Sequence, residues 1–269
     1  MIIIGEKING TLTKVREAIA ERDRDFIADL AQRQAEAGAD YLDVNAGTSP
    51  EREPEDLKWL VEVVQETVDT PLCLDSPRPE TLAEVLPLVK RPGLLNSVTA
   101  EPGKPEKVFP LAAASGFGVV ALTLDEGGIP KDAKTRVEIA ERLISEGAKY
   151  GVKEENIYVD PLVVALATEH KATQVFLEAT GEIKKRFPGV YIISGLSNVS
   201  FGLPYRRTIN RTFLVLARAA GMDAAIIDPL DEELMATVWA TELVLGEDPY
   251  CRNYLRYYRK RESKAAGKS

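Results

Sequence analysis

The stretch RDFIADLAQRQAEAGADYLDVN, residues 24–45, contains a helix, a turn and a strand in close succession. Apolar residues recur at helical spacing over Arg24–Ala37, and Gly38 follows where a helix usually ends. Tyr41–Val44 is then an apolar run of the length of a buried strand, and Asn45 comes directly after it. This unit predicts a helix that packs against a strand of a parallel sheet.

The same order of elements recurs along the chain. Ala-Gly-Ala-Asp at 37–40 is echoed by Ala-Gly-Met-Asp at 220–223, each at a helix end that leads into a strand. Alternating strands and helices are typical of parallel sheets, and 269 residues suit one eight-stranded barrel. We therefore predict an α/β fold, a single-domain TIM (β/α)8 barrel. Its strands are expected at Ile2–Ile4, Tyr41–Val44, Pro71–Leu74, Gly93–Leu95, Val119–Leu122, Ile157–Val159, Tyr191–Ile193 and Ala224–Ile227.

Helices are expected between most of these strands, and a basic tail after the last one. We predict that the barrel occupies residues 1–258 and the tail residues 259–269. The tail has two open interpretations, a solvated final helix with a frayed end or a docking patch for an acidic partner. Clear helical periodicity covers Arg24–Ala37, Glu55–Val68, Arg136–Tyr150, Thr173–Phe187, Arg211–Ala220 and Glu232–Leu245, and weaker periodicity covers Thr11–Ile19 and Pro79–Leu88.

The composition excludes several classes of function. A net charge of −8 argues against nucleic acid or a membrane surface as the partner. No apolar stretch reaches the roughly 20 residues of a membrane span, and Ile2–Ile4 is too short for a signal peptide, so we expect a cytoplasmic protein. Cys73 and Cys251 form no metal-type pair, and His170 is the single histidine, expected on the surface. We therefore expect no protein-bound metal.

Polar side chains stand at the ends of nearly all the predicted strands. A (β/α)8 barrel builds its active site at the carboxyl ends of its strands, so these groups should face one pocket. Asp75, Asn96 and Asp160 each come directly after a buried run. Carboxylates accept paired N–H donors, and an amide both donates and accepts, so the three suit the edge of a guanidine-like or pyrimidinone-like ring. An alternative is that each caps a helix N-terminus.

A second candidate group is the turn at Ser194–Ser200, which contains Gly195 and other small residues. Small residues let a ligand approach the backbone closely. The amide of Asn198 could there reach a ring nitrogen, and an ordinary turn is the alternative.

A further polar arc follows the first two strands. The alternative for its two carboxylates, Glu6 and Asp43, is a structural role. They would then brace a nearby cation, either Lys7 or Arg206. The residues of this arc are Glu6, Asn9, Asp43 and Asn45.

Eight short motifs run through the chain: GEKING at 5–10, LDVN at 42–45, LCLDS at 72–76, NS at 96–97, GIPKD at 128–132, DPL at 160–162, GLSNVS at 195–200 and INRTF at 209–213. Together they resemble the pterin-binding family, and most closely its methyltetrahydrofolate:corrinoid (iron-sulfur) protein methyltransferase branch. Each motif alone is weak, but the combination is specific. The resemblance extends from Met1 to about Tyr258 and leaves out the basic tail.

The resemblance implies a barrel that holds the pterin of tetrahydrofolate at its mouth. Asp75, Asn96 and Asp160 match the family residues that bind the pyrimidine edge of the pterin. Asn198 matches the amide that contacts N5, the atom that carries the methyl group. The residues that match the loop closing over the folate are Gly195, Ser197 and Arg206.

The reaction implied by the resemblance is SN2 transfer of a methyl group between N5 of tetrahydrofolate and the cobalt of a corrinoid (cobalamin) carried by a partner protein. Asn198 would stabilise the charge that develops at N5. The direction of transfer stays open, and the family implies a homodimer.

Two other functions are weighed against this one. A dihydropteroate synthase-like enzyme would need basic residues for the pyrophosphate of its substrate, and Ser194–Ser200 and Asp228–Asp231 offer none. A non-catalytic folate-binding or corrinoid-scaffolding protein would not need the N5 donor that Asn198 supplies.

Overall fold

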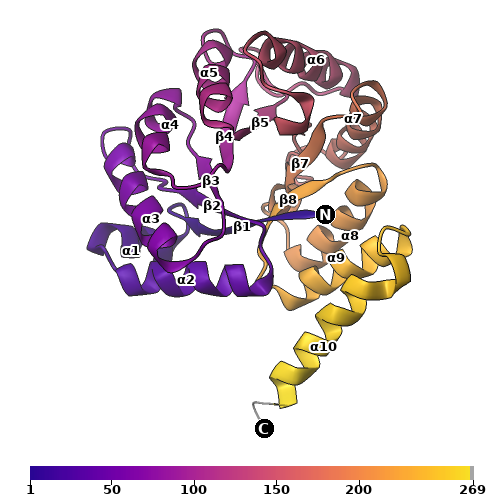
Figure 1. The fold of residues 1–269 in the computed structure, drawn as a ribbon. Coiled ribbons are helices and arrows are strands. Elements are labelled where there is room, and N and C mark those ends of the chain that lie inside the picture. Colours follow the sequence, from indigo (N-terminus) through magenta and orange to yellow (C-terminus); the bar gives the residue numbers. More distant parts are fainter. Residues whose placement is uncertain (267–269) are drawn as a thin grey trace.

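The computed structural model describes residues 1–266 as a closed parallel barrel whose strands follow one another in chain order, with helices around it (Figure 1). The predicted TIM barrel is confirmed. Hydrogen bonds between the first strand and the last close the ring. The strands are β1 (Ile2–Asn9), β2 (Tyr41–Asn45), β3 (Leu72–Asp75), β4 (Leu94–Thr99), β5 (Gly118–Leu122), β6 (Ile157–Asp160), β7 (Tyr191–Gly195) and β8 (Ala224–Ile227).

Helices connect the strands on the outside of the barrel, and short 3-10 turns supplement them. The helices are α1 (Thr13–Glu21), α2 (Arg24–Ala37), α3 (Glu53–Thr67), α4 (Pro79–Val85), α5 (Pro105–Ser115), α6 (Ala133–Lys149), α7 (Ala172–Arg186), α8 (Arg206–Ala219), α9 (Glu232–Val244) and α10 (Arg252–Ala266). The 3-10 turns are η1 (Leu86–Leu88), η2 (Glu154–Asn156), η3 (Leu196–Ser200) and η4 (Pro249–Cys251).

Four elements differ from the sequence prediction by four residues or more. β4 continues to Thr99 rather than ending at Leu95, so Asn96 belongs to the strand. β1 continues to Asn9 rather than ending at Ile4, so Glu6 and Asn9 belong to the strand. A helix, α5, was not predicted because Pro110 interrupts its sequence pattern. α8 begins at Arg206, five residues before the predicted start.

The inner and outer faces of the strands bury different sets of side chains. The interior cluster contains one residue from each of seven strands: Ile4, Cys73, Leu94, Val120, Tyr158, Ile193 and Ala224. The alternate residues face outward and pack with the helices in the larger cluster, which contains Leu42, Leu74, Leu95 and Val159. Because strand side chains alternate between the two faces, a residue two positions after an interior one also points into the barrel.

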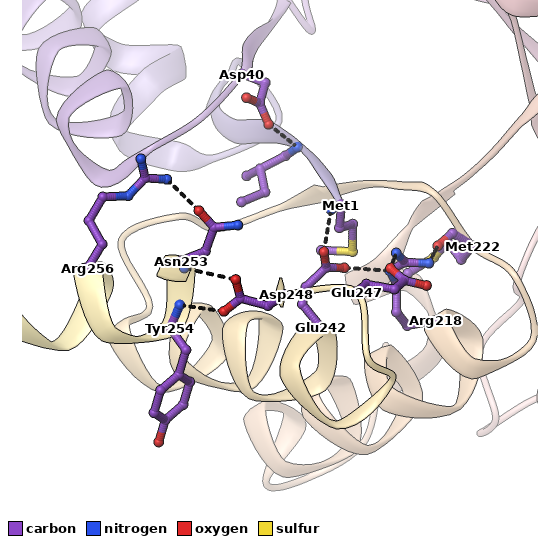
Figure 2. A network of polar contacts seen from close by, with 11 residues as sticks. Met1, Asp40, Arg218, Met222, Glu242, Glu247, Asp248, Asn253, Tyr254 and Arg256 are labelled. Carbon is purple, nitrogen blue, oxygen red and sulfur yellow. Dashed lines mark hydrogen bonds and ion pairs between the residues drawn. The ribbon is translucent and has the colours of Figure 1, made fainter. Parts of the chain in front are cut away.

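Polar contacts link the start of β1 to α9 and stabilise the start of α10 (Figure 2). The amino nitrogen of Met1 lies 3.1 Å from Glu242, which also accepts a hydrogen bond of 2.8 Å from Arg218 Nε. Asp248 accepts bonds from the backbone N–H groups of Asn253 and Tyr254, and so fixes the start of α10. These contacts lie at the end of the barrel opposite the predicted site.

Helix α10 projects away from the barrel body and runs through the predicted boundary at residues 258 and 259 (Figure 1). Tyr257 Oη donates to the carbonyl of Glu232, and Lys260 Nζ donates to that of Glu36. Arg261 pairs with Glu232 at 3.0 Å. The first part of the predicted tail is therefore continuous with α10 and contacts the barrel, while residues 267–269 lie outside the described part.

Several expectations about other features can be compared with the structure. Across residues 1–266, no helix is long and apolar enough to cross a bilayer. The side chain of His170 is 84% exposed, so its predicted surface position is confirmed. Cys73 is buried in the barrel and Cys251 is partly buried, and both are free thiols.

Candidate active site

The residues predicted to bind the ring edge lie on the interior face of the barrel, at its carboxyl end. Asp75 and Asn96 each come two residues after a member of the interior cluster, and they are register partners on β3 and β4. Asp160 follows Tyr158 in the same way on β6. Strand alternation therefore turns all three side chains toward the mouth of the barrel.

Asp75 is held from one side by the neighbouring strand. Asn45 Nδ2 donates to Asp75 Oδ2 at 2.7 Å. Burial raises the pKa of Asp75 to about 6, while the bond from Asn45 acts in the opposite direction. One carboxylate oxygen is thus fixed by the protein, and the other is available to accept a hydrogen bond from a ligand.

Asn96 is oriented by a carboxyl group deeper in the barrel. Its Nδ2 lies 3.4 Å from Asp43 Oδ1, so its amide carbonyl is turned away from Asp43. Burial, followed by the charge of Asp75, raises the pKa of Asp43 well above its usual range. Asp43 has no salt-bridge contact with Lys7 or Arg206 within the described residues, and the bracing alternative is wrong for it.

Asp160 is the last residue of β6. Its Oδ1 accepts the backbone N–H of Leu162 at 2.7 Å. Burial raises its pKa to about 7, and backbone N–H groups of Leu162 and Gly195 offset part of that rise.

The helix-capping alternative is wrong for the three ring-edge residues. The helices that follow their strands have Arg78, Lys104 and Lys171 at their N-caps. Carboxylates do cap helices elsewhere, at Asp23, Asp132 and Asp231. Asp75, Asn96 and Asp160 are therefore not accounted for as helix caps.

Asn198 lies in η3, directly over Gly195. A Cβ atom at Gly195 would come within 2.9 Å of Asn198 Nδ2, so a larger residue there would displace the amide from this position. Gly195 follows the interior residue Ile193 by two positions, which places the amide at the mouth of the barrel. Asn198 is exposed, so its amide is accessible to a ligand at the mouth of the barrel.

Arg206 holds the same turn from the first residue of α8. Its NH2 donates to the Ser197 carbonyl at 2.8 Å, and its Nε donates to Ser200 Oγ at 3.0 Å. Ser197 Oγ lies 3.3 Å from Glu6 Oε2, so the turn also contacts β1. Arg206 therefore supports η3 from a helix rather than from a loop.

Glu6 and Asn9 occupy different positions on β1. Burial and the charge of Asp228 raise the pKa of Glu6 to about 7, while Lys7 and Arg206 lower it. The predicted bracing thus applies to Glu6 as a charge interaction, although Lys7 forms its ion pair with Asp228 at 3.1 Å. Asn9 Oδ1 accepts from the backbone and hydroxyl of Thr11, so its carbonyl stabilises a turn.

One supporting residue was missed by the sequence analysis. Arg136 on α6 is only 2% exposed, and its guanidinium donates to the carbonyls of Pro130 and Pro161. It thereby joins the loops after β5 and β6 next to Asp160. The sequence signal that could have identified Arg136 is its place in the first turn of a helix whose apolar face is predicted to be buried.

A closed α/β barrel whose mouth gathers buried carboxyl and amide groups suited to a flat, nitrogen-rich ring defines a class of pterin-binding barrels. A family described as "Pterin binding enzyme" matches residues 5–228. The chain belongs to this family, and the resemblance predicted from its motifs is confirmed.

Two relatives and one solved structure illustrate the similarity. The chain is 46% identical over 261 residues to the methylcorrinoid:tetrahydrofolate methyltransferase of Eubacterium limosum, with 96% of each chain covered. It is 36% identical over 240 residues to the methionine synthase of Mycobacterium tuberculosis, covering 84% of this chain and 20% of that protein. A dihydropteroate synthase structure from Xanthomonas albilineans, in complex with 7,8-dihydropteroate, shares the fold with a TM-score of 0.66 at 22% identity, over 92% of this chain and 93% of that one.

Proposed function

We propose that this protein is a methyltransferase that moves a methyl group between N5 of tetrahydrofolate and the cobalt of a corrinoid carried by a partner protein. The observation that carries the proposal is the arrangement of Asp75, Asn96 and Asp160 inside the barrel mouth, with the Asn198 amide at its edge. The full-length similarity to a methylcorrinoid:tetrahydrofolate methyltransferase supports it.

The three interior residues would bind the pterin. The amino group and ring N–H of the pyrimidine edge are adjacent donors, and carboxylates of Asp75 and Asp160 can accept them. Asn96 would present its carbonyl, because its Nδ2 is directed to Asp43. This arrangement fixes the ring, so that N5 points toward the open mouth where a large partner can approach.

Asn198 would act at the reacting atom. In an SN2 transfer the C–N5 bond breaks as the methyl–cobalt bond forms, and N5 gains electron density. A side-chain N–H aimed at N5 stabilises that charge and binds the transition state better than the ground state. The same contact serves the reverse transfer, so the site is compatible with either direction.

The proposal can be tested by two spectroscopic assays with free corrinoids. We expect cob(I)alamin to be methylated by methyltetrahydrofolate, and methylcobalamin to lose its methyl group to tetrahydrofolate. Folate binding without transfer in either assay would favour the scaffolding alternative. Formation of dihydropteroate from a pterin pyrophosphate and p-aminobenzoate would favour the synthase alternative.

The affinity for methyltetrahydrofolate should rise with pH. The ligand-free pKa of Asp160 is raised to about 7 by burial, and that of Asp75 to about 6. Because pterin N–H groups favour the ionised carboxylates, binding at lower pH requires proton release. We expect affinity to increase by at most about tenfold per pH unit and per proton released as pH rises through this window.

Calorimetry in buffers of different ionisation enthalpy would measure the protons released. The control is Asp160→Asn, whose affinity for methyltetrahydrofolate should vary less with pH because the variant lacks the titrating carboxyl group. Net proton uptake by the wild type would contradict this assignment.

We also propose that the protein forms a homodimer through an apolar face on α8 and α9. Val215 and Leu216 on α8 and Val244 and Leu245 at the end of α9 are exposed, Val244 by 85%. Exposed apolar patches commonly mark interfaces, and a second copy of the chain is the occupant that the family implies.

Substitution Val244→Arg should convert the dimer to a monomer, because the interface would have to bury an unpaired charge. Sedimentation velocity measures the outcome. Ile129→Arg, an exposed apolar position in the loop after β5, is the matched control and should leave the dimer intact. A monomeric wild type would rule out the interface.

We further propose that the corrinoid partner docks at the open mouth and that the enzyme acts in the cytoplasm. Two free cysteines suit a reducing compartment. The basic residues of α10 remain a second candidate contact for an acidic partner surface.

A further inference from the structure

Asp43 lies one layer below the residues of the proposed pterin site and has no assigned role in the reaction. It is 2% exposed, and its register partner on β3 is Cys73, one interior layer below Asp75. The ionisable groups that act on it are the carboxyls of Asp75 and Glu6 and the thiol of Cys73. Asn96 on β4 is its neutral neighbour.

Across residues 1–263, whose side chains the structure describes, no lysine, arginine or histidine forms an ion pair with Asp43 that would balance its charge. An unpaired buried anion is strongly disfavoured, and two carboxyl groups that share a site do not both ionise readily. Burial and the charge of Asp75 accordingly raise the pKa of Asp43 well above its usual range.

We propose that Asp43 is a neutral carboxylic acid that positions Asn96 and leaves Asp75 as the anion of this part of the pocket floor. The inference rests on the proposed pterin site. Its Oδ1 accepts the Nδ2 group of Asn96, at 3.4 Å, so the Asn96 carbonyl is the atom presented to the pterin. Asp43 is thus a positioning residue, and the donors on the pterin edge meet one full negative charge at β2–β3 instead of two.

Two substitutions separate a neutral acid from an anion. Asp43→Asn keeps an oxygen that accepts from Asn96 and has the charge of the protonated acid, whereas Asp43→Ala removes the acceptor. We expect the methyltetrahydrofolate dissociation constant of D43N to stay within about threefold of wild type and that of D43A to rise about tenfold. The matched control D75N, which removes the charge one layer higher, should weaken binding by about tenfold or more.

A measurement without folate keeps the proposal testable if D43A does not fold. The infrared difference spectrum of wild type minus D43N, at about pH 8, should contain the carbonyl band of a protonated carboxylic acid.

Stability provides a second readout without folate. Above the pKa that Asp43 has in the unfolded chain, the unfolded chain loses a proton that the folded protein keeps. The free energy of unfolding therefore falls as pH rises. The ratio of the unfolding equilibrium constant of wild type to that of D43N should therefore rise about tenfold per pH unit from about pH 5 to about pH 7.

The outcomes are decisive. Losses in D43N as large as those in D43A, no acid band, or a pH-independent ratio of unfolding constants would show that Asp43 is ionised and would overturn the proposal. If wild type fails to bind methyltetrahydrofolate while the acid band is present, the proposed function fails and the protonation state of Asp43 stands.

Discussion

Replacing Asn198 with alanine should slow methyl transfer by about 100-fold while changing the affinity for methyltetrahydrofolate by no more than about threefold. The donor at N5 matters most when the C–N5 bond is breaking, because N5 then carries additional electron density. A contact that strengthens only in the transition state affects the rate of transfer rather than binding of the substrate. The position of the Asn198 amide over Gly195, at the mouth of the barrel, is suited to this contact.

Single-turnover kinetics with cob(I)alamin would measure the transfer step, and calorimetry would measure folate binding. Asn156→Ala is the matched control, because Asn156 precedes β6 and lies at the opposite end of the barrel. It should leave both quantities unchanged. Equal losses of rate and affinity in Asn198→Ala would mean that Asn198 only binds the ground state.

The barrel could be predicted from the sequence because its strands are apolar on both faces for most of their length. β1 was predicted too short for the same reason. Its second half contains Glu6 and Lys7. Glu6 is buried near Asp228 and Ser197, and the Gln34 side chain accepts from the Lys7 N–H at 3.0 Å where the register shifts. A strand that lines a polar site loses the apolar pattern by which it is recognised.

Helix α5 was missed because two prolines suggest a loop. Pro105 occupies the first turn, where no N–H is needed, and Pro110 removes one hydrogen bond farther along. Val108, Phe109 and Ala112 are fully or almost fully buried against the barrel. Burial of this apolar face outweighs the local cost of Pro110, which no local sequence rule can show.

The ring-edge residues were predictable, but their surroundings were not. Each lies two positions after an interior apolar residue, and this spacing is readable in the sequence. The contact between Asp43 and Asn96 and the link from Arg136 to the Pro161 carbonyl join segments 25 or more residues apart. Such contacts arise from register and helix packing, so their signal is not local.

Replacing Asp75 with alanine should weaken methyltetrahydrofolate binding by about 100-fold, because hydrogen bonds to a charged group are worth roughly 1.5–3 kcal/mol and the affinity changes tenfold per 1.4 kcal/mol. The loss includes the cost of leaving Asn45 Nδ2 unpaired, since this group donates to Asp75 at 2.7 Å. The edge that Asp75 binds is remote from N5 and does not change its charge during transfer.

The substitution should therefore raise KM far more than it lowers kcat, which is the opposite of the change expected for Asn198→Ala. Calorimetry and saturation kinetics on Asp75→Ala would measure the two quantities. Asp125→Ala is the matched control, because Asp125 pairs with Arg142 on the outside of the barrel at 2.6 Å and should leave both unchanged. Wild-type affinity in Asp75→Ala would show that Asp75 does not bind the pterin. A lower kcat with unchanged KM would instead show that Asp75 acts in the chemistry at N5.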